Sequence, residues 1–116
     1  FNFFISHKGI RHIDKKQFDS NYETDYVTGC CLLISKNKFI ELKGFDESFN
    51  MYGEDVDLCI RAKTLGMKCY YIGNSKLWHN VSSSYGGHYS LSKHFSKLNS
   101  LLKLIIKHPK KIIFGK

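Results

Sequence analysis

The chain has 116 residues and a formal net charge of +8, and 42% of its residues are hydrophobic and 15% aromatic. This apolar content and the single proline exclude a disordered polypeptide, and the length suffices for one hydrophobic core. The sequence contains no run of about 18 apolar residues, so no segment of it would cross a membrane by itself.

The N-terminal part combines short apolar runs with one polar segment. Residues 2–6 predict a short strand, and residues 7–23 predict an exposed loop. Residues 26–34 are mostly apolar and predict a buried strand. Ser35 is a suitable N-cap for a short helix that ends at Gly44. Together these features favour an α/β domain.

The cysteine pattern argues against disulfides and zinc. The four cysteines include no C-x-x-C pair, and Cys30 and Cys31 would point to opposite faces of the strand over residues 26–34. Small buried thiols of a reducing compartment are the better interpretation. We therefore expect a cytoplasmic protein.

The middle of the chain predicts a helix followed by two strands. In the helix, over residues 54–65, apolar residues recur at helical spacing and Gly66 follows the end. Residues 68–72 and 76–80 predict short strands. The segment of residues 81–89 predicts a flexible loop, because it contains two adjacent glycines and three serines.

Two carboxylates, Glu54 and Asp55, occupy the first turn of this helix. The free N–H groups and the helix dipole favour ionised carboxylates there, which suits a base. The alternative is a purely structural role, because acidic residues often stabilise a first turn. Asp55-Val56-Asp57 is an Asp-x-Asp string but a poor metal motif, because residues two apart on a helix do not face each other; Asp57 has the spacing of an ion pair with Arg61.

A wider set of motifs surrounds these carboxylates. Its members, in this order and spacing, are Thr28-Gly29-Cys30-Cys31-Leu32-Leu33-Ile34, Gly44-Phe45-Asp46-Glu47, Met51-Tyr52-Gly53-Glu54-Asp55-Val56-Asp57-Leu58 and Trp78-His79. Together they resemble the C-terminal half of the catalytic domain of glycosyltransferase family 2, especially its rhamnosyltransferase-like members. The resemblance implies a GT-A fold, a mixed sheet with flanking helices, of which this chain is the acceptor-side half.

The resemblance also implies roles for individual residues. Asp55 matches the catalytic base that takes a proton from the acceptor hydroxyl, and Glu54 the neighbour that orients the acceptor. His79 matches a ligand of a divalent metal, Mn²⁺ or Mg²⁺, that neutralises the donor diphosphate. The other metal ligands would come from residues outside this chain.

Four further residues are candidates for binding acceptor or donor. Gly29 and Tyr52 lie within the matching motifs. Trp78 would wall a sugar site, or would pack in the core as a lone tryptophan often does. His88 lies in the loop after His79, where a closing lid would contact a phosphate; a surface role is the alternative.

The resemblance implies a catalytic domain about twice as long as this chain. The sequence also begins with Phe1 rather than Met. We therefore expect residues 1–116 to be a single domain that is a fragment of a longer catalytic domain, inactive by itself. Residues 1–90 would form the acceptor-side α/β half. An exposed sheet edge on such a fragment favours self-association, which a homodimer would satisfy.

Residues 91–116 predict a basic amphipathic helix and tail, with the helix over 91–107 stopped by Pro109. Seven lysines lie here around an apolar stripe. The stripe consists of Leu91, Phe95, Leu98, Leu102 and Ile105. Two interpretations remain open: a helix peripheral on the anionic inner face of the cell membrane, or one packed on the catalytic core.

The sequence thus favours the acceptor and base half of an inverting, metal-dependent glycosyltransferase. It would use a nucleotide-sugar donor and a glycan or lipid-linked acceptor in cell-surface polysaccharide synthesis. The alternative is a non-catalytic basic module that binds anionic membrane or nucleic acid. Nucleic acid is not expected, because Arg11 and Arg61 are the only arginines.

Overall fold

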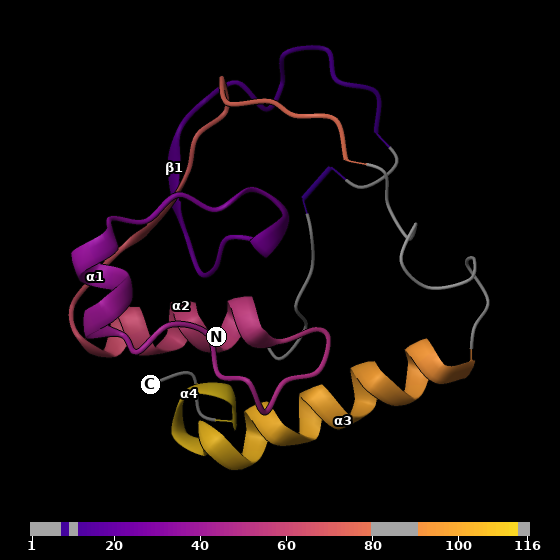
Figure 1. The fold of residues 1–116 in the computed structure, drawn as a ribbon. Helices are drawn as coiled ribbons and strands as arrows, with labels where there is room; N and C mark the ends of the chain where they lie inside the picture. The colour runs from indigo at the N-terminus through magenta and orange to yellow at the C-terminus, as the bar shows by residue number, and fades with distance from the viewer. Residues whose placement is uncertain (1–7, 10–11, 80–90, 114–116) are drawn as a thin grey trace.

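The computed structural model describes residues 8–9, 12–79 and 91–113. They form a small α/β domain with a two-stranded sheet and helices (Figure 1). In chain order the elements are β1 (Tyr22–Thr24), the 3-10 turn η1 (Gly29–Cys31), α1 (Lys36–Glu41), α2 (Glu54–Thr64), β2 (Cys69–Tyr71), α3 (Leu91–Lys107) and α4 (Pro109–Ile113).

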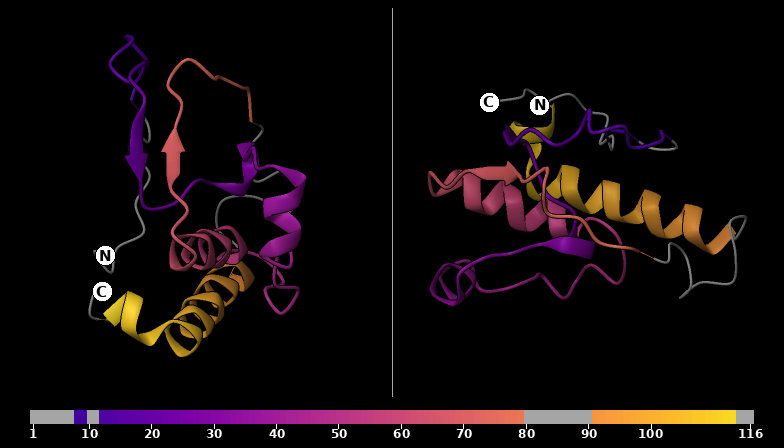
Figure 2. Two further views of the ribbon diagram at one scale, coloured as in Figure 1. Left: turned by 90° about the vertical axis from the view of Figure 1, so that its left-hand side faces the viewer. Right: turned by 90° about the horizontal axis from the view of Figure 1, so that it is seen from above.

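The sheet joins segments that are far apart in the sequence. β1 and β2 pair antiparallel, with Tyr22 opposite Tyr71 and Thr24 opposite Cys69. The rings of the two tyrosines lie 4.9 Å apart, and such cross-strand aromatic pairs stabilise a sheet. The left view of Figure 2 shows the two strands side by side, away from the α2–α3 pair.

The ends of α1 and α2 follow from local sequence. The Ser35 hydroxyl accepts a hydrogen bond from the Lys38 N–H at 3.4 Å, which confirms the predicted N-cap. Gly44, with φ +68°, and Gly66, with φ +77°, follow these helices in the left-handed conformation. After α2, the Met67 N–H reaches back to the Ala62 carbonyl at 3.0 Å, as in a Schellman motif.

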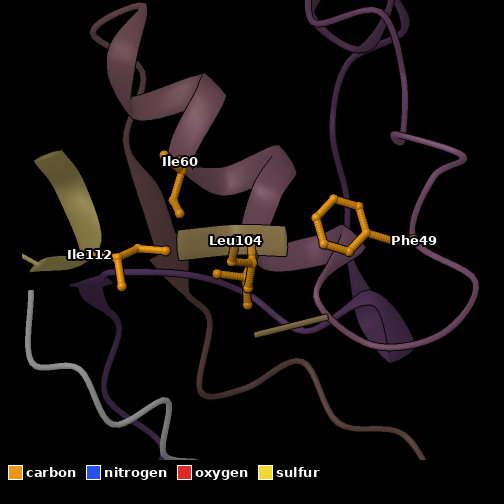
Figure 3. Packing of buried hydrophobic residues seen from close by; sticks show 5 residues of the cluster. Phe49, Ile60, Leu104 and Ile112 are labelled. Atoms are coloured by element: carbon orange, nitrogen blue, oxygen red, sulfur yellow. The ribbon is translucent and has the colours of Figure 1, made fainter. Parts of the chain in front are cut away.

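The core lies where α2 packs on α3. Figure 3 shows Leu104 of α3 between Phe49, from the loop before α2, and Ile112 of α4, with Ile60 of α2 beside them. Val56 completes this cluster. Burying several large apolar side chains is the main favourable contribution to such a fold, and this cluster is one of two in the described residues, the other being Leu42, Leu58 and Ala62.

The C-terminal helix has the predicted bounds, Leu91–Lys107. Pro109 ends it, as expected, because proline has no N–H to continue the helix. The same proline then occupies the first position of α4, where its fixed φ is favourable. Part of the expected tail is therefore a second short helix.

Two predicted strands are wrong. Residues 26–34 are largely extended but form no ladder, and η1 interrupts them with a hydrogen bond from the Cys31 N–H to the Thr28 carbonyl. Residues 76–79 are also irregular. The sheet is consequently antiparallel rather than mixed within the described ranges, because neither segment finds a partner strand there.

The cysteine prediction is half right. Cys59 and Cys69 are buried free thiols, but Cys30 and Cys31 are exposed because they lie in η1 instead of a buried strand. The predicted strand over residues 2–6 and the loop over residues 81–89 fall outside the described residues.

The apolar stripe predicted for the C-terminal helix does not pack as one face. Phe95, Leu98 and Leu102 are exposed, whereas Ile105 packs against the core cluster. Within the described residues, core packing therefore holds for Ile105 but not for the other three. The buried residues of α3, Ser100 and Leu104, lie on the opposite side of the helix.

Candidate functional site

The start of α2 is held in an unusual backbone conformation. Tyr52 has a φ of +68° and Gly53, the N-cap, a φ of +89°. Positive φ is rare for a non-glycine residue and tends to occur at functional sites. A Cβ on Gly53 would also come within 3.3 Å of Leu104 and Phe49, so the strained turn is seated directly on the core.

Asp55 links this helix start to the segment before α1. One carboxylate oxygen, Oδ2, accepts a hydrogen bond from the Gly29 N–H at 2.9 Å. The other, Oδ1, accepts from the Val56 N–H at 2.8 Å. Two residues that the motifs single out, 26 positions apart, therefore meet. The two bonds fix the carboxylate's orientation and leave lone pairs on both oxygens for a hydroxyl.

Glu54 presents the feature most suggestive of a missing ligand. Its Oε2 atom is buried and has no hydrogen-bond partner among residues 12–79 and 91–113. A buried carboxylate oxygen without a partner carries a desolvation cost of about 1–3 kcal/mol or more. An incoming polar group that donates a hydrogen bond would offset this cost.

Tyr26 is a neighbour of Asp55 that the sequence analysis did not single out. Burial raises the pKa of its phenol, and the negative charge of Asp55 raises it further. The phenol therefore stays protonated at neutral pH. No sequence signal could have found this electrostatic interaction, because the two residues are 29 positions apart.

Asp57 has a different role from Asp55. Its fully buried carboxylate accepts from Arg61 Nε at 2.8 Å and contacts Lys107 Nζ at 2.8 Å and His108 Nε2 at 2.7 Å. Burial by itself would raise the Asp57 pKa, but hydrogen bonds from Lys107, His108 and Arg61 outweigh it, so the pKa is lowered. This network ties α2 to the α3–α4 corner. The predicted Arg61 pair is confirmed, and Asp55 and Asp57 do not act as one metal motif.

The loop before α2 is held by α3. Lys107 also contacts Asp46 at 2.5 Å, and Lys103 donates to the Ser48 carbonyl. Lys97 lies over the Tyr52 ring, 5.3 Å from its centre. Lysines of α3 thus support the residues that lead into Glu54 and Asp55.

The remaining site candidates are not brought to this group. Trp78 and His79 are exposed, and within the described ranges they form no hydrogen bond or ion pair with Glu54 or Asp55. Residues 72–79 run beyond the end of β2 that is farther from α2, in orange in Figure 1 and the left view of Figure 2. Trp78 is therefore not a core residue. His88 lies outside the described residues.

The described residues do not by themselves make a metal site. Among those residues, no group of three or more histidines, cysteines or acidic residues could hold an ion. His79 alone is too few ligands for Mn²⁺ or Mg²⁺.

A cavity of about 950 Å³ lies elsewhere, between the strands and α2. Its lining includes Tyr22, Leu58, Cys69 and Tyr71 but neither Glu54 nor Asp55. It is therefore not the place where these carboxylates would act.

In the part of the chain that the structure describes, no helix is both long enough and apolar enough to span a bilayer.

Comparison with known proteins gives a family match that includes this helix start. A family model described as the N-terminal domain of galactosyltransferase matches residues 9–94. Rhamnosyltransferase WbbL of Escherichia coli K12 is 33% identical over 60 residues, which are 52% of this chain and 23% of that protein.

Two further relatives match similarly. The N-acetylglucosaminyl-diphospho-decaprenol L-rhamnosyltransferase of Mycobacterium tuberculosis is 36% identical over 61 residues, 53% of this chain and 20% of that protein. The O-antigen biosynthesis protein RfbC of Myxococcus xanthus is 34% identical over 58 residues, 50% of this chain and 4% of that protein. No solved structure matches.

The matched segments thus span less than a quarter of each of these relatives. The family model, however, covers most of this chain, including β1, α1, α2 and β2. The chain therefore belongs to this glycosyltransferase family, whose model is described as the N-terminal domain of galactosyltransferase.

Proposed function

We propose that this chain forms the acceptor side of an inverting glycosyltransferase of family 2 with a GT-A fold, and that Asp55 is its catalytic base. The observation that carries the proposal is the helix start itself. There, Gly29 and Val56 hold the Asp55 carboxylate, and Glu54 keeps a buried oxygen without a partner. The relatives' names support transfer of a deoxyhexose such as rhamnose in polysaccharide synthesis.

The proposed step is general-base catalysis. A sugar hydroxyl is a poor nucleophile, and a positioned carboxylate makes it a better one by taking its proton as the new glycosidic bond forms. Asp55 takes that proton as the hydroxyl oxygen bonds to the anomeric carbon of the donor sugar, while the bond from that carbon to the nucleoside diphosphate breaks and the diphosphate leaves with the electron pair. Glu54 Oε2 accepts a hydrogen bond from a second hydroxyl of the acceptor and so orients it. Gly29, whose N–H binds Asp55, lies at the same place, and Tyr52 precedes Glu54 by two residues.

The test is Asp55→Asn in the whole protein, with sugar transfer measured from a nucleotide-sugar donor. The asparagine keeps an oxygen for the Gly29 N–H, so the fold should persist. The transfer rate should fall by about a hundredfold or more with donor binding little changed, as loss of a general base requires. Asp25→Asn, at an exposed carboxylate, is the matched control and should retain activity. Turnover of the Asp55 variant within a few-fold of wild type would contradict the assignment.

Divalent metal dependence is a separate proposal. His79 would contribute a single ligand, with the other ligands outside this chain, and no step above depends on it. Titration of this chain alone with Mn²⁺ should give negligible heat in calorimetry. A tight stoichiometric site would mean that the chain holds a complete metal centre.

The alternative of a purely non-catalytic basic module is less well supported. Membership of a glycosyltransferase family favours the enzyme. The basic C-terminal helices are compatible with an enzyme, because a transferase can also have a docking surface.

A further inference from the structure

Two buried cysteines from different elements meet in the fold, and the proposed transfer reaction uses neither of them. Cys59 lies in the middle of α2, and Cys69 is the first residue of β2. The left view of Figure 2 shows β2 leading away from the end of α2 after a short turn. Both residues are free thiols, 3% and 9% exposed. A hydrogen bond links their side chains, so the two sulfur atoms face each other.

Backbone contacts fix the position of each thiol. The Val27 N–H donates to the Cys59 sulfur at 3.5 Å, and the same sulfur lies 3.9 Å from the Val27 carbonyl oxygen. Cys69 is held by the β1–β2 ladder, opposite Thr24. A cysteine has one side-chain torsion with three staggered positions, so a fixed backbone leaves its sulfur few places to go. The fold itself therefore keeps the pair together.

The two thiols have different electrostatic surroundings. The hydrogen bond from Cys59 lowers the pKa of Cys69; burial opposes this shift, and the charge of Lys63 adds to it. The same hydrogen bond and burial raise the pKa of Cys59, as does the negative charge of Asp55. Because the thiolate is the reactive form of cysteine, Cys69 is the nucleophile of the pair and Cys59 its protonated partner.

The cavity between the strands and α2 gives small molecules a route to this pair. Both cysteines line it, together with apolar residues such as Leu58 and Ala62. Its volume of about 950 Å³ far exceeds the roughly 30 Å³ that one water occupies, so a small uncharged oxidant fits. A closed zinc site is the poorer alternative, because it takes four ligands and no group of three forms among the described residues.

We infer that Cys59 and Cys69 form a reversible oxidation site, at which a peroxide converts the thiol pair into a disulfide. The Cys69 sulfur attacks one peroxide oxygen; the S–O bond forms as the O–O bond breaks, and the departing hydroxide takes up the proton that Cys69 released. The Cys59 sulfur then attacks the sulfenic acid, and the S–S bond forms as the S–O bond breaks. The hydroxyl leaves as water with the Cys59 proton. Two thiols are thus oxidised and hydrogen peroxide is reduced to two waters.

The experiment treats the whole, fully reduced protein with hydrogen peroxide, alkylates the remaining thiols and maps the peptides by mass spectrometry. Peptides linked through Cys59 and Cys69 should be the main disulfide product, and dithiothreitol should abolish them. Cys59→Ala should leave Cys69 as a sulfenic acid that dimedone labels. Cys69→Ala should slow oxidation of Cys59 by about tenfold or more. Circular dichroism checks the fold of each variant.

The matched control is Cys30→Ala with Cys31→Ala, which removes the two exposed thiols and should leave the Cys59–Cys69 link unchanged. The folded wild-type protein decides the question even where a variant fails to fold. The inference is overturned if peroxide oxidises Cys30 or Cys31 while Cys59 and Cys69 stay unlinked. A link that forms only after denaturation, or a main product that joins Cys31 to either buried thiol, would overturn it equally.

Discussion

The α2–α3 junction and the β1–β2 ribbon use ion pairs in opposite ways. At the junction, Asp57 is 0% exposed and contacts three basic side chains. Where the ribbon meets α2, the pair between Asp25, just after β1, and Lys63 of α2 has a carboxylate that is 65% exposed. A pair in water contributes about 0–1 kcal/mol, whereas breaking a buried pair leaves charges without compensation. The comparison indicates that the junction, rather than the ribbon, fixes α2 and hence the orientation of Asp55.

The largest expected effect tests the apolar part of this junction. Leu104→Asp would bury an unpaired charge at the centre of the core. We therefore expect the free energy of unfolding to fall by more than about 4 kcal/mol, and the variant to show no cooperative unfolding transition. Leu98→Asp, at an exposed position of α3, should change the free energy of unfolding by less than about 1 kcal/mol. Denaturant unfolding followed by circular dichroism measures both. Similar losses for the two variants would contradict the described rotation of α3.

The second effect compares the two kinds of ion pair directly. Asp57→Ala should lower the free energy of unfolding by roughly 3–5 kcal/mol, because Arg61, Lys107 and His108 lose their shared carboxylate. Asp25→Ala, which removes the exposed pair between the end of β1 and α2, should lower the free energy of unfolding by about 1 kcal/mol or less. The same unfolding measurement separates them. Equal costs would mean that the buried network does not hold the junction.

Acid should reveal the same network. The Asp57 pKa is lowered in the folded state, so its contribution to stability is present above the unfolded pKa, near 4, and is lost as pH falls through the lower folded pKa. Asp57→Asn should therefore be less stable than wild type at pH 6, and the difference should shrink below about pH 4. Unfolding curves across this pH range measure it. A stability difference that grows as the solution becomes more acidic would contradict the lowered pKa.

The smallest effect concerns the turn that presents the carboxylates. Gly53→Ala places a Cβ on a residue with positive φ and presses it against Leu104 and Phe49. We therefore expect the free energy of unfolding to fall by about 1–3 kcal/mol. Gly66 has a similar φ, but a Cβ at this position would lie in open space. Gly66→Ala should therefore lower the free energy of unfolding by less than Gly53→Ala does. Thermal unfolding compares the two variants. A larger loss at Gly66 would show that contact with the core does not constrain Gly53.

The helices could be predicted from the sequence because their signals are local. Apolar spacing, the Ser35 cap and the glycines after α1 and α2 placed both of these helices, and Pro109 placed the end of α3. The same local spacing gave the Asp57–Arg61 pair. For the candidate site, the position of Glu54 and Asp55 at the start of a helix was confirmed, whereas their catalytic roles stay predictions.

Only the tertiary structure decided how these elements use their neighbours. Residues 26–34 have strand-like composition, yet strand formation requires a partner, and the described chain provides none. The Gly29–Asp55 bond and the contacts of Asp57 with Lys107 and His108 join residues 26 to 51 positions apart. The sequence likewise determined that α3 is amphipathic, but not which of its apolar residues are buried, because that depends on where α2 and the loop before it lie.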